Sequence, residues 1–102
     1  MYAAVDLGSN SFRMHIGRFD GDAMRIIKSA REPLRLGAGL DAQGNLTEVA
    51  IQNAIAALAR FRIILNQYTL DAVRVVATNT MRIAKNANQF IPELENAIGC
   101  PI

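Results

Sequence analysis

The stretch VDLGSNSFRMHIG, residues 5–17, places an acid and a cluster of small polar residues between two apolar segments. Gly, Ser and Asn are common turn residues, so a tight hairpin is the simplest interpretation. Two features favour binding chemistry instead. A carboxylate inside an apolar strand, here Asp6, is costly to bury without a partner. The loop is also rich in N–H and O–H donors, and such a loop can surround an anion. It consists of Gly8, Ser9, Asn10 and Ser11.

Asp6 by itself would repel an anion bound to this loop. A divalent cation between the carboxylate and the anion removes the repulsion, because such a cation binds carboxylate and phosphate oxygens alike. The stretch therefore predicts a site for a phosphate group and a metal ion, with Asp6 next to the metal, directly or through water.

A second polar segment, ATNTMR at residues 77–82, also follows an apolar segment. It contains hydroxyl groups and an amide, and it ends at Arg82, near the expected start of a helix. Helix N-termini attract anions, and an arginine can donate two hydrogen bonds to a phosphate group. The alternative is that Thr80 caps the helix and Arg82 is solvated. Because ligands gather at the carboxyl ends of strands in open sheets, we expect both segments to meet around one phosphate.

Other candidate motifs are less specific. GAGLDA at residues 37–42 matches the dinucleotide-binding pattern G-x-G-x-x-A, but it neither ends a clear strand nor opens a helix. The neighbouring Arg31 and Arg35 could help to attract an anion, although surface arginines are more often only solvated. His15 has no Ser or Cys nucleophile in register, and we interpret Cys100 as a small apolar filler.

Hydrophobic patterning indicates the elements that must position these residues. Residues 2–7 are expected to form a buried strand. Residues 12–19 alternate in polarity and are followed by an Asp-Gly turn and a third strand at 23–29, which is typical of a β-hairpin. Residues 31–46 carry three glycines and a proline and are expected to be a loop.

A helical period follows from about residue 47 to 67, with Thr47 as its N-cap. Its apolar stripe consists of Ile51, Ala54, Ile55, Leu58, Phe61 and Leu65. The strand expected at 73–78 is then parallel to the first strand, because a long helix between two strands favours a crossover connection. Two helical pieces come next, the second with Asn88 as its N-cap and Gly99 at its end.

Composition excludes several classes of protein. The chain has 102 residues, enough for one small domain, and a formal net charge of +2 without a block of like charge, which argues against nucleic-acid binding. One cysteine excludes an intrachain disulfide and is compatible with a reducing cytoplasm. We expect neither a signal peptide nor a membrane span.

The same residues carry a resemblance to a known family. The chain resembles the N-terminal part of exopolyphosphatase and guanosine pentaphosphate phosphohydrolase (Ppx/GppA) proteins. The matching segments are YAAVDLGSNSFRMHI at 2–16, RLGAGLD at 35–41 and VRVVATNTMRIAKNANQFIPELENAIGCPI at 73–102. The combination of DLGSNS with AT-x-T-x-R-x-A-x-N is much more specific than either motif alone.

The resemblance implies an incomplete α/β domain of the ribonuclease-H-like type, as in actin, sugar kinases and Hsp70, with three antiparallel strands, a crossover helix and a parallel strand. It implies release of terminal phosphate from inorganic polyphosphate or of the 5′-phosphate from pppGpp, with Mg²⁺ or another divalent cation. The phosphate loop would be Gly8, Ser9, Asn10 and Ser11. Asp6 would lie near the metal and Arg82 would reach the phosphate that is cleaved, while Arg18 and Arg35 would touch the substrate.

The resemblance also implies that residues 1–102 are the N-terminal part of the first domain of a larger enzyme. The family's catalytic glutamate and its second phosphate loop would follow CPI, so this chain alone is expected to be inactive. The expected partners are the substrate, the rest of the same enzyme and, in the full-length form, a second copy. An ATP-binding sugar kinase or ATPase of the same superfamily, or an anion-binding module without catalysis, are the alternatives.

Overall fold

A four-stranded mixed sheet forms the base of the molecule in the computed structural model, which describes residues 1–78 and 80–102. The strands are β1 (Tyr2–Leu7), β2 (Ser11–Asp20), β3 (Ala23–Pro33) and β4 (Ala72–Ala77), in the order β3-β2-β1-β4. β2 is antiparallel to β1 and to β3, whereas β4 is parallel to β1. The predicted hairpin and crossover are therefore confirmed.

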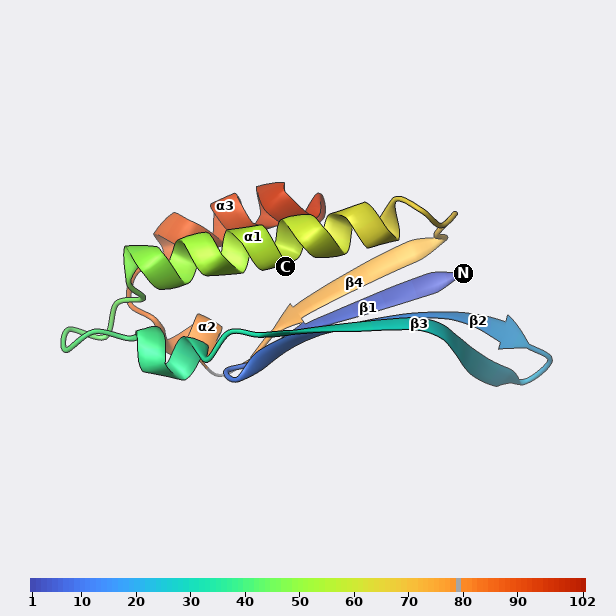
Figure 1. Cartoon of the computed structure of the whole chain (residues 1–102), viewed down its shortest axis with the longest axis horizontal. Helices are drawn as coiled ribbons and strands as arrows, with labels where there is room; N and C mark the ends of the chain where they lie inside the picture. Colours follow the sequence, from blue (N-terminus) through green and yellow to red (C-terminus); the bar gives the residue numbers. More distant parts are fainter. Residues whose placement is uncertain (79) are drawn as a thin grey trace.

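Helices cover one face of this sheet only. α1 (Glu48–Leu65) and α3 (Ala87–Ile98) lie side by side on that face, and the one-turn helix α2 (Thr80–Ile83) and the 3-10 helix η1 (Leu36–Gly39) lie at one end of the sheet (Figure 1). The core lies between sheet and helices. Its largest fully buried side chains include Phe12, Phe61, Phe90, Leu58 and Met14.

The uncovered face corrects the interpretation of Asp6. Side chains of β1 alternate between exposed and buried, so Val5 and Leu7 enter the core while Asp6 faces solvent. The strand is thus half-buried rather than buried, and the Asp6 carboxylate needs no partner to offset a burial cost. The period-2 pattern was obscured in the sequence because Ala4, on the same exposed side, is also apolar.

The β2–β3 hairpin is longer than its predicted strands. β3 continues to Pro33, so residues 31–33 are strand and not loop. A β-bulge between Ile16 and Gly17 interrupts the register, since Ile16 pairs with Lys28 but Gly17 pairs with Ile26. Gly21, at φ 68°, makes the expected Asp-Gly turn.

α1 has the predicted position and cap. The Thr47 side chain accepts a hydrogen bond from the Ala50 N–H at 3.3 Å, as an N-cap does. Ile51 and Leu58 are buried and Ile55 is half-buried, so the predicted stripe faces the core. Arg60 donates two hydrogen bonds to Glu32 at 2.7 and 3.2 Å, which joins α1 to β3 and raises the pKa of Arg60.

The predicted start of α3 is wrong by two residues. Asn86, not Asn88, precedes the first turn, and its side chain does not cap the helix. Instead, its amide bonds to both the N–H and the C=O of Leu46, at 2.9 and 3.0 Å. An asparagine does precede the helix, as expected, but its side chain bonds to Leu46 instead of to the first turn of α3.

In the parts of the chain that the structure describes, no helix combines the length and apolar character needed to cross a bilayer.

Candidate functional site

The loop between β1 and β2 is a tight turn in which the backbone of Gly8 closely approaches that of Ser11. The Gly8 N–H donates to the Ser11 carbonyl at 3.1 Å, which closes the loop. A Cβ at position 8 would lie 3.0 Å from that carbonyl oxygen. The sequence therefore needs Gly8 for close approach, with Ser9 and Asn10 at the tip.

Two outside segments hold the backbone of this loop. The Asn10 carbonyl accepts from the N–H groups of Leu34 and Arg35, both at 3.0 Å, and the Ser9 carbonyl accepts from the Gly37 N–H at 3.3 Å. Arg35 takes a left-handed conformation, φ 52°, to donate in this way. The N–H groups of Ser9 and Asn10 donate to none of the residues described. The Ser9 and Asn10 carbonyls are thus hydrogen-bonded, whereas the N–H groups of the same two residues have no acceptor among the described residues and could bind an anion.

The loop after β4 meets the loop after β1. Because β1 and β4 are parallel and in register, Leu7 and Ala77 end at the same edge of the sheet, near η1 and α2 (Figure 1). The Thr78 N–H continues the ladder to the Leu7 carbonyl at 3.2 Å. Thr80 then contacts Ser9: its hydroxyl lies 2.8 Å from Ser9 Oγ, and its backbone N–H donates to the same oxygen at 3.4 Å.

The Ser9–Thr80 contact is what sequence reasoning missed. Thr80 had been interpreted only as the alternative cap of a helix, but it is the first residue of α2 and its side chain turns toward the loop. α2 is also a single turn, too short to support the expected helix-dipole attraction. Asn79, which belongs to the same motif, lies outside the described residues.

Arg82 lies two residues beyond that contact, exposed to solvent. It lines a hollow of about 510 Å³ beside β4, with Val76, Met81, Ile91 and Ile102. α2 therefore carries both a residue anchored to the loop, Thr80, and an arginine free to reach outward.

The arginines expected at the substrate lie in different places. Arg35 adjoins the loop through its backbone. Arg18 pairs with Arg25 near the hairpin tip, seven residues along β2 from Ser11 and roughly 23 Å away at about 3.3 Å per residue. The structure does not bring Arg18 to the loop.

Asp6 is the one carboxylate on β1, and its side chain is exposed without an ion pair to any described residue. Within residues 1–78 and 80–102, no three His, Cys, Asp or Glu side chains converge on one point. Mg²⁺ commonly keeps several waters and uses one or two carboxylates together with substrate phosphates. An exposed Asp6, two residues before the loop that begins at Gly8, fits such an ion.

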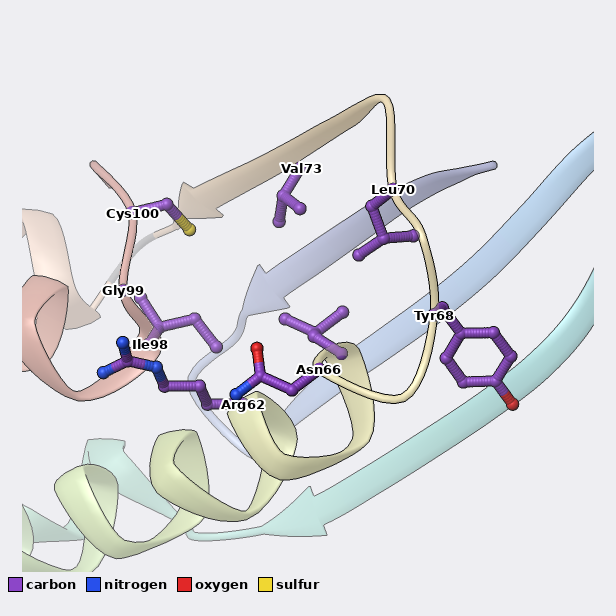
Figure 2. Close-up of a pocket in the computed structure, with 9 residues that line it drawn as sticks. Arg62, Asn66, Tyr68, Leu70, Val73, Ile98, Gly99 and Cys100 are labelled. Carbon is purple, nitrogen blue, oxygen red and sulfur yellow. The ribbon is translucent and has the colours of Figure 1, made fainter.

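A second hollow, of about 330 Å³, lies between the C-terminal ends of α1 and α3 (Figure 2). Arg62, Tyr68, Leu70 and Cys100 are among its lining residues. Burial raises the pKa of the Cys100 thiol, which favours the unreactive protonated form. Neither the β1–β2 loop nor the segment after β4 borders this hollow, and the half-buried place of Cys100 agrees with the filler role expected of it.

Comparison with known proteins identifies the family. The model of the Ppx/GppA phosphatase family matches residues 15–102. The chain belongs to this family. Among solved structures, an exopolyphosphatase-like protein is 31% identical with a TM-score of 0.90, over 98% of this chain and 31% of its own. The Aquifex aeolicus Ppx/GppA enzyme is 29% identical with a TM-score of 0.90, over 98% of this chain and 33% of its own.

An exopolyphosphatase from Cytophaga hutchinsonii has the same fold, with a TM-score of 0.90 at 24% identity, over 98% of this chain and 32% of its own. The chain thus spans about a third of the length of these Ppx/GppA relatives. The expected fold class, a part of a ribonuclease-H-like domain with a mixed sheet, is confirmed.

Proposed function

We propose that the protein carrying this chain is a phosphoanhydride hydrolase that releases a terminal phosphate, and that this chain supplies one side of its phosphate site. The observation that carries the proposal is the contact of Ser9 with Thr80. It joins a donor-rich loop to the segment that bears Arg82, at the carboxyl ends of two adjacent parallel strands.

The substrate that we propose is inorganic polyphosphate or pppGpp. Membership of the Ppx/GppA phosphatase family and the likeness to exopolyphosphatases support a phosphatase. The same membership argues against the sugar kinase alternative. Both proposed substrates end in a phosphate with several anionic oxygens, which suits two free N–H groups and an arginine. A cytoplasmic location accompanies this proposal and is compatible with the single cysteine.

The reaction would be in-line attack of water on the terminal phosphorus. The new P–O bond forms as the bridging P–O bond breaks, and the shortened substrate leaves with the bridging oxygen. Negative charge on the transferred group would be stabilised by the Ser9 and Asn10 N–H groups, by the Asn10 side-chain amide and by Arg82. The glutamate expected to take the proton of the water would belong to the part of the relatives that this chain does not cover.

Asp6 would help to hold Mg²⁺ through water at the phosphate. The ion would supply charge neutralisation on the phosphate oxygens. The loop itself contributes donors and no acidic side chain, so the roles of cation and loop are complementary.

Phosphate release from polyphosphate and from pppGpp by the protein at its natural length tests the proposal. We expect release with Mg²⁺, loss of release with EDTA, and strong reduction by Asn10→Ala. Asn88→Ala, which truncates an exposed asparagine on α3, is the matched control and should retain activity. Absence of phosphate release from both substrates would overturn the proposal.

A further inference from the structure

The Ser9 hydroxyl makes two hydrogen bonds to one residue. It lies 2.8 Å from Thr80 Oγ1, and the Thr80 N–H donates to it at 3.4 Å. Thr80 is 4% exposed, so solvent does not compete for its hydroxyl. The backbone N–H can only donate, so Ser9 Oγ is its acceptor, whereas either hydroxyl can supply the proton of the 2.8 Å bond.

A serine hydroxyl has one proton to donate and two lone pairs that accept. Two bonds to the same buried residue fix where the Ser9 hydroxyl lies. We propose that Thr80 is a positioning residue, which holds the Ser9 side chain in the orientation in which its hydroxyl meets a phosphate oxygen. This inference rests on the proposed function.

The proposal assigns Ser9 to the phosphate rather than to the metal. Mg²⁺ is commonly held by one or two carboxylates together with waters and substrate phosphates, and a neutral hydroxyl is the weaker ligand. Asp6, exposed and without an ion pair among the described residues, is the group available to the cation. Loss of the Ser9 hydroxyl should therefore weaken phosphate binding without changing the requirement for Mg²⁺.

Thr80 also connects the loop to Arg82. Thr80 and Arg82 belong to the same single turn, and a turn of four residues has little rigidity of its own. On the other side of the loop, the Gly37 N–H fixes the Ser9 carbonyl at 3.3 Å. Ser9 is thereby held from η1 through its backbone and from α2 through its side chain, so Thr80 sets the spacing between the loop and Arg82.

The test uses four variants of the natural-length protein: Thr80→Val, Thr80→Ser, Ser9→Ala and the double variant Ser9→Ala with Thr80→Val. Thr80→Val keeps the shape of the side chain but removes its hydroxyl, and should raise KM and weaken inhibition by inorganic phosphate about tenfold. Thr80→Ser keeps the hydroxyl, so its KM and its inhibition by phosphate should lie within about twofold of the wild-type values. Thr69→Val, the same change in an exposed loop at the other end of the sheet, is the control.

The double variant distinguishes positioning from a separate contribution. If Thr80 acts through Ser9, the double variant should be no weaker than Ser9→Ala alone. In all variants the Mg²⁺ concentration for half-maximal activity should stay unchanged, and the thermal midpoint is measured alongside. Additive losses, no rescue by Thr80→Ser at an unchanged midpoint, or a shift in Mg²⁺ dependence would each overturn the inference. Inactive wild-type protein would instead overturn the proposed function on which the inference rests.

Discussion

Arg82 is an exposed side chain on a one-turn helix, and its removal leaves no cavity in the core. In the natural-length protein we expect Arg82→Ala to lower turnover on the order of 100-fold, because one donor to the developing charge is lost. The thermal midpoint should hardly change. If Arg82 donates two hydrogen bonds to the phosphate, Arg82→Lys should restore little of the lost turnover. Arg74→Ala, an exposed arginine within β4, is the control, and near-normal turnover of Arg82→Ala would remove Arg82 from the site.

Gly8 and Gly37 offer a matched pair of glycines at the same loop. A Cβ at Gly8 would press on the Ser11 carbonyl at 3.0 Å, whereas one at Gly37 would meet only Thr80 Oγ1 at 3.8 Å. We expect Gly8→Ala to cost about 1–3 kcal/mol of stability and to weaken phosphate binding, because the Ser11 carbonyl must shift to make room for the added methyl group. Gly37→Ala should leave the thermal midpoint nearly unchanged. Equal midpoints for both variants would contradict this account of the turn.

Asn86 acts at the scale of elements, because it joins the entry of α1 to the entry of α3. Its two hydrogen bonds to Leu46 span 40 residues of sequence. Asn86→Ala leaves a part-buried N–H and C=O unpaired and should cost about 2 kcal/mol. The measurement is the thermal midpoint, with Asn88→Ala as the control. A larger drop in thermal midpoint for Asn88→Ala than for Asn86→Ala would instead identify Asn88 as the residue that stabilises the start of α3.

The sequence predicted the elements that local contacts determine, and it did not predict the features that depend on contacts between distant parts of the chain. The strands, α1 and the Thr47 cap follow from periodicity and local chemistry, and they were predicted within a few residues. Three features depend on tertiary packing, about which hydrophobic periodicity carries no information. They are the Asn86 contact, the extension of β3 to Pro33 and the exposure of Asp6. At the site, the polar loops were predictable but the Ser9–Thr80 contact was not, because it joins residues 71 positions apart.

At the scale of the whole molecule, the face of the sheet opposite α1 and α3 is uncovered (Figure 1). Near the hairpin tip this face exposes Tyr2, Phe19, Met24 and Ile26, each at least 41% accessible. An exposed apolar patch of this kind promotes association. We expect chain 1–102 to self-associate with rising concentration in sedimentation velocity, and Phe19→Ser with Ile26→Thr to reduce it. Concentration-independent sedimentation of the unchanged chain would contradict this expectation.

Chain 1–102 is also expected not to hydrolyse polyphosphate or pppGpp by itself. Two of its glutamates are engaged away from the β1–β2 loop: Glu32 pairs with Arg60, and Glu95 accepts from the Ile102 N–H at 2.8 Å. Without a base, bound water has no group to take its proton. Mg²⁺-dependent phosphate release by the purified chain, abolished by Asn10→Ala, would refute this prediction.

The parallel pairing of β1 with β4 has a kinetic consequence. Residues that meet there are about 70 positions apart, as in the ion pair of the Met1 amine with Asp71 at 2.7 Å. The β2–β3 hairpin and α1 use short-range contacts and can form early, whereas this ladder must first close a long loop of chain. The two halves of the proposed phosphate site therefore come together late in folding. On the ribosome, Ser9 emerges long before Thr80 exists to orient it, so the site is among the last features to mature.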